Sequence, residues 1–151
     1  THYISNIKDS IDQEFYSLIS ILFLNRGLCF KQLKEFNNAI DNFSKSLIFN
    51  PDNHKAQYQR LELNYNKGEY LDAQEDYVKL KQANSKLLSE FKTSEYILNL
   101  KAEEKKKELT GEMMGKLKDV GNSLLGMFGM SLDNFQLNQN NGGGYNIQYK
   151  N

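Results

Sequence analysis

The chain has 151 residues, of which 25% are charged, and its 19 basic and 19 acidic side chains balance to a formal net charge of zero. A chain of this length can bury the core of one domain of several helices, whereas its balanced charge gives no support to nucleic-acid binding. It contains no run of about 18 apolar residues, so we expect no membrane-spanning segment. The single cysteine, Cys29, cannot form an internal disulfide bond, which favours a reducing compartment.

The N-terminal segment has apolar side chains at three- and four-residue steps, which is the spacing of an amphipathic helix. These residues are Tyr3, Ile4, Ile7, Ile11, Phe15, Leu18 and Leu22. We interpret residues 1–9 as the second helix of a repeat whose first helix is absent, and we predict that a new helix begins between Ser10 and Ser17. Because the first residue is Thr1 rather than methionine, we expect the chain to be a fragment.

Residues 20–53 carry small, aromatic and proline residues where a pair of crossed helices needs them. Counted from Ser20, positions 4, 8, 11, 20, 24 and 32 hold Phe23, Gly27, Phe30, Ala39, Phe43 and Pro51. Small residues let two helices approach closely, aromatic residues fill the space around them, and proline ends a helix. The segment resembles a tetratricopeptide repeat, a helix–turn–helix unit of about 34 residues, with Arg26 in place of the usual leucine.

The same pattern returns in weaker form over residues 54–85. Gly68, Tyr70, Ala73 and Tyr77 match it, whereas Gln57, Leu61, Asn64 and Ser85 depart from it. We predict helices over residues 17–33, 35–49, 52–66 and 70–81, stacked as an all-α, right-handed superhelix of tetratricopeptide type. One such helix pair cannot bury its own apolar face, so the repeats require neighbours.

The sequence from residue 86 predicts a long helix without a break before Gly111, followed by a short amphipathic helix. The charged run over residues 101–108 contains three glutamates and indicates a solvated face rather than a basic patch. A stripe of methionine, leucine, valine and phenylalanine follows over residues 111–128. We expect these helices to cap the repeats, although such a stripe can also enter a partner's groove or lie on a membrane surface.

The last residues change their period from helical to alternating. Apolar and polar residues alternate on both sides of Gly142–Gly144, which predicts a small β-hairpin and leaves disorder as the alternative. We therefore divide the chain into repeats over 1–85 (a half repeat, then 20–53 and 54–85), capping helices over 86–128 and a tail over 129–151.

No pattern in the sequence points to catalysis, a cofactor or a metal. Neither histidine, His2 or His54, has a cysteine, a second histidine or a carboxylate at ligand spacing. Residues 111–117 resemble a phosphate-binding loop only superficially, because the glycines are too close and no serine or threonine follows the lysine. We predict a protein that is not an enzyme.

Stacked repeats present their first helices on a concave surface that usually recognises an extended peptide. The candidate peptide-binding residues are Asn25, Leu28, Lys55, Gln59 and Arg60. The sequence is similar to tetratricopeptide co-chaperones that capture the C-terminal carboxylate of heat-shock chaperones. This resemblance implies that Asn25 and Lys55 donate hydrogen bonds to that carboxylate. The family's arginine falls at Gln59, with Arg60 as a neighbouring substitute, and its other lysine and asparagine belong to a repeat helix absent here.

From Leu22 onward the chain also resembles the tetratricopeptide repeat protein one family. The resemblance is carried by residues 23–27, Asn50–Pro51, residues 73–77 and above all residues 114–137, which generic repeats lack. It implies a cytoplasmic adaptor associated with chaperones and protein folding. The alternatives are a scaffold that binds other proteins without a carboxylate clamp, and peripheral membrane association through residues 111–128.

Overall fold

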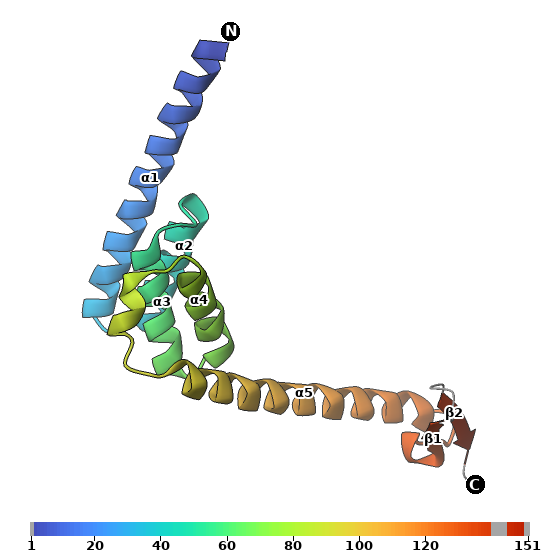
Figure 1. The fold of residues 1–151 in the computed structure, drawn as a ribbon. Helices are drawn as coiled ribbons and strands as arrows, with labels where there is room; N and C mark the ends of the chain where they lie inside the picture. The colour runs from blue at the N-terminus through green and yellow to red at the C-terminus, as the bar shows by residue number, and fades with distance from the viewer. Residues whose placement is uncertain (1, 140–144, 150–151) are drawn as a thin grey trace. The chain divides into compact units, whose positions relative to one another are not determined.

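The computed structural model describes residues 2–139 and 145–149. The chain divides by its contacts into two compact units, Thr1–Lys105 and Lys106–Asn151. The first unit contains α1 (His2–Gln32), α2 (Phe36–Phe49), α3 (His54–Lys67), α4 (Tyr70–Gln82) and the short 3₁₀ helix η1 (Lys86–Glu90). The helix α5 (Glu95–Gly126) begins in the first unit and ends in the second, which also holds η2 (Leu132–Asn134), β1 (Phe135–Gln139) and β2 (Tyr145–Tyr149) (Figure 1).

The first four helices form two successive helix–turn–helix pairs. α1 packs on α2, α2 on α3, and α3 on α4. Each helix of the two full repeats ends within one residue of its predicted end, and the predicted fold class, tetratricopeptide-like helix pairs with a long C-terminal helix and a small hairpin, is confirmed.

The turns inside both helix pairs have the same geometry at equivalent places. Lys34 and Gly68, which are 34 positions apart, both adopt left-handed backbone conformations, with φ of 61° and 84°. In each turn the residue that follows donates a hydrogen bond from its backbone amide to a carbonyl in the last turn of the preceding helix. The amide of Glu35 donates to the carbonyl of Phe30, and the amide of Glu69 donates to the carbonyl of Asn64, both at 2.9 Å. This arrangement satisfies carbonyl groups that a helix end would otherwise leave free, and its recurrence supports two tandem repeats.

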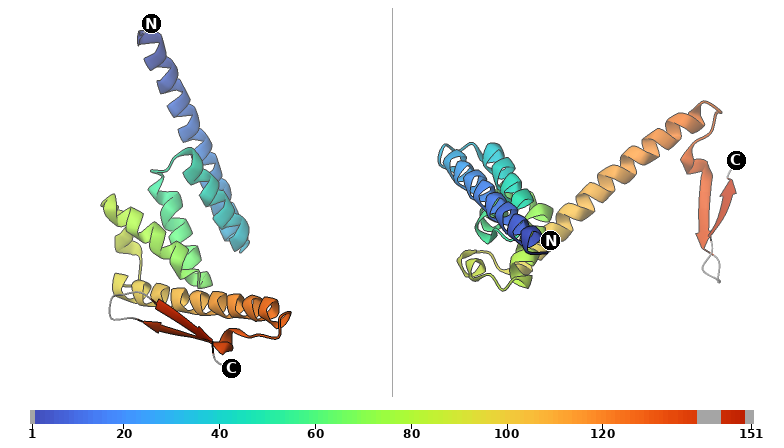
Figure 2. Two further views of the ribbon diagram at one scale, coloured as in Figure 1. Left: turned by 90° about the vertical axis from the view of Figure 1, so that its right-hand side faces the viewer. Right: turned by 90° about the horizontal axis from the view of Figure 1, so that it is seen from above.

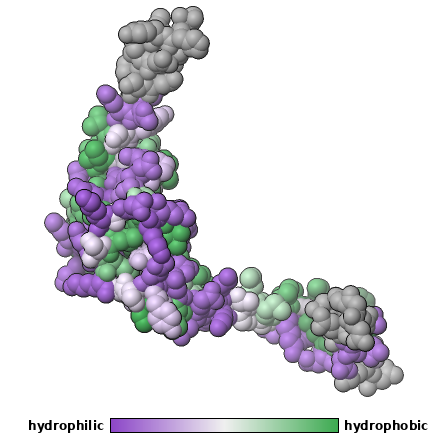
Figure 3. Space-filling model, in the orientation of Figure 1, coloured by the Kyte–Doolittle hydropathy of each residue, from purple (hydrophilic) through white to green (hydrophobic). Residues whose placement is uncertain are grey.

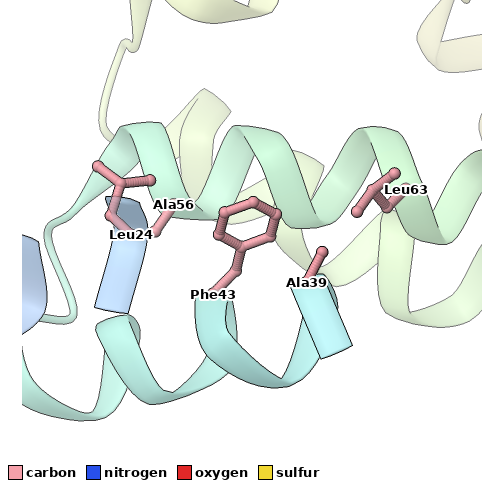
Figure 4. Close-up of a cluster of buried hydrophobic side chains, with 5 residues drawn as sticks. All are labelled: Leu24, Ala39, Phe43, Ala56 and Leu63. Carbon is pink, nitrogen blue, oxygen red and sulfur yellow. The ribbon is translucent and has the colours of Figure 1, made fainter. Parts of the chain in front are cut away.

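The first core lies where α1, α2 and α3 meet, and Figure 4 shows its five buried residues. These are Leu24, Ala39, Phe43, Ala56 and Leu63. The ring of Phe43 is fully buried, and a Cβ atom added to Gly27 would lie only 2.5 Å from it. Glycine is therefore required at this position because α1 and α2 approach so closely that the phenylalanine ring occupies the place of any side chain.

The second core shows why the second repeat can depart from the pattern. Leu61 stands at the position equivalent to Gly27 and is fully buried, as is Ala73, the counterpart of Ala39. Tyr77, the counterpart of the buried Phe43, is only partly buried against this cluster. The second repeat thus has a buried leucine and a partly buried aromatic ring where the first has a glycine and a fully buried ring, an exchange of large and small side chains that cores tolerate.

The start of α3 is tied to both preceding helices by one asparagine. The side-chain oxygen of Asn53 accepts a hydrogen bond from the amide of Ala56 at 3.2 Å, which caps the helix. Its amide nitrogen donates to the hydroxyls of Ser20 on α1 and Ser46 on α2, both at 3.0 Å. The first turn of α3, which carries Lys55, is therefore held against α1 and α2.

The predicted break between Ser10 and Ser17 is wrong, because α1 runs without interruption from His2 to Gln32. This part of the sequence contains neither proline nor glycine, so no residue ends the helix there. The apolar side chains Phe15, Leu18 and Leu22 are 59%, 61% and 68% exposed along α1, and apolar residues are visible on this part of the surface (Figure 3). The division of the chain at residues 85 and 128 stays a prediction.

The predicted boundaries of the long helix are also wrong. Residues 86–90 form η1 instead of the start of a long helix, and α5 begins only at Glu95, where the hydroxyl of Ser94 accepts from the amide of Ile97 at 3.4 Å. Leu98 of α5 then joins the second core. The helix does not break at Gly111, because a single glycine costs a helix only about 1 kcal/mol relative to alanine.

The C-terminal unit contains the predicted hairpin. β1 and β2 pair antiparallel with Phe135 opposite Tyr149, whose rings meet edge to face at 5.4 Å, and the two strands lie side by side in Figure 2. The expected glycine-rich turn falls at residues outside the described ones. Next to α5, the amide of Leu132 donates to the side-chain oxygen of Asn122 at 2.7 Å, and the absence of a side chain at Gly121 leaves room for Leu132.

Candidate functional site

Two adjoining pockets lie along α3 in the N-terminal unit. The first, which we call the leucine pocket, has a volume of about 170 Å³ and is lined by Leu24, Leu28, Lys55, Gln59 and Leu87. The second, which we call the glutamate pocket, has about 260 Å³ and is lined mainly by Glu62, Tyr65, Phe91, Lys92 and Thr93. Tyr58 and Glu90 line both pockets. We refer to these two neighbouring pockets together as the α3 groove.

Three of the five residues predicted to bind peptide come together in the leucine pocket. Leu28 on α1 lies across from Lys55 and Gln59 on α3. Lys55 is exposed, and no residue in the described part of the chain forms an ion pair with it. Asn25 is exposed on α1 but does not line the pocket. The structure therefore places one free ammonium group at an apolar pocket between the first helices of the two repeats.

The structure corrects the role expected for Arg60. Its guanidinium group binds the carboxylate of Asp76 on α4 through two hydrogen bonds, Nε to Oδ2 at 2.8 Å and Nη2 to Oδ1 at 2.7 Å, and also donates to Ser44 on α2 at 2.9 Å. Asp76 is only 1% exposed. The hydrogen bond and charge of Asp76 raise the pKa of Arg60 against the opposing effect of burial. Arg60 thus joins α2, α3 and α4 and does not substitute for an arginine in the groove.

Sequence reasoning missed Lys31, which connects the two walls of the groove. Its ammonium group donates to the side-chain oxygen of Gln59 at 2.7 Å and to the carboxylate of Glu62 at 2.5 Å. The contact bridges α1 and α3 and occupies the amide oxygen of Gln59. The signal in the sequence is the helical spacing, since Lys31 follows Leu28 by three residues and so shares its face of α1.

The segment η1 supplies the wall opposite α3. Leu87 and Glu90 face the pockets from this short helix, while Leu88 and Phe91 pack with Tyr65 and Tyr77 on the second core. The ring of Phe91 meets the ring of Tyr65 edge to face at 5.5 Å. Because residues 86–90 look like the beginning of a long helix in the sequence, neither Leu87 nor Glu90 could be assigned to the groove from the sequence alone.

Tyr58 stands at the boundary between the two pockets and is only 7% exposed. Burial and the negative charges of Glu62 and Glu90 raise its pKa above the ordinary value. The phenol therefore keeps its proton at neutral pH and can both donate and accept a hydrogen bond. No residue within the described ranges forms a hydrogen bond with its hydroxyl.

The C-terminal unit has an apolar pocket of its own, of about 670 Å³. It is lined largely by Met114, Leu117 and Leu132, and the ion pair between Lys118 and Asp133, at 2.8 Å, stands at its edge. Between residues 113 and 128, seven large apolar side chains are 59–80% exposed: Met113, Met114, Leu117, Val120, Leu124, Met127 and Phe128. The predicted capping role of residues 86–128 stays a prediction.

Two properties of the described residues bear on the kind of site present. These residues contain no group of three or more histidine, cysteine, aspartate or glutamate side chains placed to hold a metal ion. None of their helices combines the length and the apolar character needed to cross a membrane.

A comparison with known protein families identifies the helix pair that forms one side of the groove. A family model described as tetratricopeptide repeat matches residues 20–53, which is the segment from the second half of α1 to the turn before α3. No solved structure matches the chain.

Proposed function

This chain is a tetratricopeptide repeat protein, and on that premise we propose that it is a non-enzymatic adaptor that binds an extended segment of a partner protein in the α3 groove. One observation carries this proposal: Leu28, Lys55 and Gln59, from the first helices of two consecutive repeats, line one open pocket. The pocket offers apolar surface for a side chain and an ammonium group for a carboxylate, which are the two kinds of contact that peptide-binding grooves combine.

The finer proposal is a co-chaperone that binds the C-terminal carboxylate of a heat-shock chaperone. Lys55 would donate a charge-assisted hydrogen bond to that carboxylate, and Asn25, one residue from the pocket-lining Leu24, would add an amide donor. Only a chain end has this group, which would make the interaction selective for C-termini. An exposed, free thiol at Cys29 goes with a cytoplasmic location for such a protein.

A pair of peptides that differ only in their last group tests the role of Lys55. We expect a chaperone C-terminal peptide with a free carboxylate to bind about tenfold more tightly than its amide, because a hydrogen bond to a charged group contributes about 1.5–3 kcal/mol. Lys55→Gln is expected to remove this difference, measured as the dissociation constant by fluorescence anisotropy. The matched control is Lys45→Gln on α2, whose ammonium group pairs with Asp41 at the surface and which should bind like the unchanged protein.

A second candidate is a scaffold that binds internal peptide segments without a carboxylate clamp. One reason is that Arg60 binds Asp76 and so is not available to a carboxylate of the partner. Another is that three leucines line the pocket: Leu24, Leu28 and Leu87. In that case the free acid and the amide bind equally well, and Leu28→Asp abolishes the binding of both. Equal binding would thus overturn the carboxylate clamp and leave the adaptor function in place.

A further inference from the structure

The last part of α5 carries a regular row of exposed apolar side chains. Met113, Leu117, Val120 and Leu124 follow one another at intervals of four, three and four residues, and Met127 comes three residues later, just past the end of the helix. All five are 59–80% exposed. Because these intervals average about 3.5 residues, the side chains stay in line along one face, which is the spacing that two helices use to pack along each other. We call these five residues the seam.

The 3₁₀ helix η2 covers one flank of the seam and leaves the seam itself open. A Cβ atom added to Gly121, which directly follows the seam residue Val120, would lie 2.7 Å from Cδ1 of Leu132. The side-chain oxygen of Asn122 holds this leucine in place by accepting a hydrogen bond from its amide. The chain thus fills that flank itself. What remains for another molecule is a straight apolar row about 20 Å long, given a rise of about 1.5 Å per residue.

The charges around the seam favour a protein surface over a lipid one. Residues 111–135 contain two lysines, Lys116 and Lys118, and three acidic residues, so they have no basic face of the kind that draws a helix to anionic lipids. Lys118 is already paired with Asp133. Within residues 2–139 and 145–149, neither Lys116 nor Asp119 forms an ion pair. Each of these two directly precedes a seam residue, so both lie on the flank opposite the one that η2 covers.

The exposed apolar area is about what a small symmetric dimer needs. A large aliphatic side chain buries roughly 60–120 Å² of apolar surface. At the observed exposures, the seam together with its neighbours Met114 and Phe128 offers about 400 Å² in each copy. Two copies face to face therefore bury about 800 Å² of apolar surface, or about 1,200 Å² in total, because homodimer interfaces are about 65% apolar. Stable interfaces begin at about this size.

We propose that the seam binds the same seam of a second copy of this chain, with the two helices antiparallel. This interface lies outside the α3 groove and does not depend on the proposed function. A two-fold axis between Leu117 and Val120 places Leu117 of each copy beside the partner's Val120, and Met113 beside the partner's Leu124. One apolar surface thus matches itself, which is what a two-fold symmetric interface requires.

The flanking charges select the antiparallel arrangement. When two helices pack antiparallel, equivalent flanks meet, so Lys116 of each copy faces the partner's Asp119, and the two-fold axis forms this pair twice. In a parallel dimer the same flank would meet the one that η2 covers, where Lys118 is already bound to Asp133. Complementary charges beside an apolar seam set the orientation of paired helices in this way.

Sedimentation velocity of the whole chain tests the dimer. Under reducing conditions, which keep the exposed Cys29 from crosslinking copies, we expect a concentration-dependent change from monomer to dimer. The dissociation constant should be on the order of 10 μM, because the area is at the lower end of the range for stable interfaces. Leu124→Asp should weaken association at least about 100-fold, because the dimer would then bury two unpaired carboxylates.

The matched control is Ile48→Asp on α2. This apolar side chain is 75% exposed but lies outside the seam, so the variant should dimerise like the unchanged protein. Equal helical circular dichroism signals of the three proteins would show that the loss in Leu124→Asp is one of association and not of folding.

Two charge reversals test the arrangement of the copies. Lys116→Glu and Asp119→Lys should each weaken self-association about fivefold or more, because each turns two attractive pairs into repulsive ones. In a heterodimer of the two variants both pairs are attractive again. We therefore expect an equimolar mixture to sediment as a dimer at concentrations at which each variant alone is a monomer.

Three results would overturn the inference, and none of them bears on peptide binding in the α3 groove. A dimer that survives Leu124→Asp places the interface elsewhere, and a mixture that associates no better than its two components contradicts the antiparallel pairing. A chain that is monomeric at every concentration has no such interface. Flotation with phospholipid vesicles, lost in Leu124→Asp, would then assign the seam to a membrane surface, whereas no flotation would leave it to the capping role or to another protein.

Discussion

Replacing Phe43 with alanine is expected to lower the free energy of unfolding of the N-terminal unit by about 3–5 kcal/mol. The ring is fully buried between α1, α2 and α3, and it fills the space that Gly27 leaves open. Its removal leaves a cavity between the three helices, lined by Leu24, Ala39 and Leu63, which partial relaxation does not close. The loss is a large fraction of the stability of a typical domain, about 5–15 kcal/mol.

Urea unfolding followed by the helical circular dichroism signal measures this loss. The matched control is Phe36→Ala, at the start of the same helix, because Phe36 is 43% exposed and contributes little buried area. We expect the control to change stability far less than Phe43→Ala. Equal effects of the two substitutions would mean that the contact between Gly27 and Phe43 does not organise the first repeat.

Asp76→Ala is expected to have a comparable effect, about 3–5 kcal/mol, for an electrostatic reason. The substitution removes the carboxylate that binds Arg60 through two hydrogen bonds and leaves a largely buried guanidinium group without its counter-charge. Gln57, whose amide points to the same carboxylate at 3.5 Å, also loses a neighbour. Because the pair joins α3 to α4, the loss should fall mainly on the packing of the second helix pair.

The same unfolding experiment on Asp41→Ala supplies the comparison. Asp41 pairs with Lys45 one helical turn away, and both side chains are about half exposed, so this exposed pair contributes at most about 1 kcal/mol. If both aspartate variants proved equally stable, the interpretation of Arg60 as a structural residue would be wrong. Arg60 would then be free to act in the groove as the neighbouring substitute for the arginine that the resemblance places at Gln59.

The repeat fold could be predicted from the sequence because a few residues leave little choice of structure. Gly27 and Ala39 mark the close approach of two helices, and Pro51 and Gly68 mark turns. The start of the first repeat helix could not be predicted, because the expected break rested on the repeat pattern and not on any helix-ending residue near Ser10. Residues 86–90 consist of ordinary helix formers, and the packing of Leu87 and Leu88 on the repeats, which the local sequence does not encode, decides that they form η1.

Only those residues of the candidate site that occupy defined positions of the repeat could be predicted from the sequence. Leu28, Lys55 and Gln59 occupy positions on the first helices that face the inner surface, so counting along the repeat was enough to bring them together. Arg60 follows Gln59 directly, but one residue along a helix is a rotation of about 100°, which turns Arg60 towards Asp76. Tyr58 and Glu90 could not be placed together from the sequence, because Glu90 reaches the pockets only through the packing of η1.

The most direct test of the central claim, that the α3 groove receives the partner, is an NMR titration of the whole chain with a peptide that binds it. We predict that the backbone amide signals of Leu28, Lys55, Tyr58 and Glu90 shift together with one dissociation constant, while those of Ser44 and Asp76 stay in place. Shifts confined to α2 and α4, with the signals of the groove unchanged, would contradict the account.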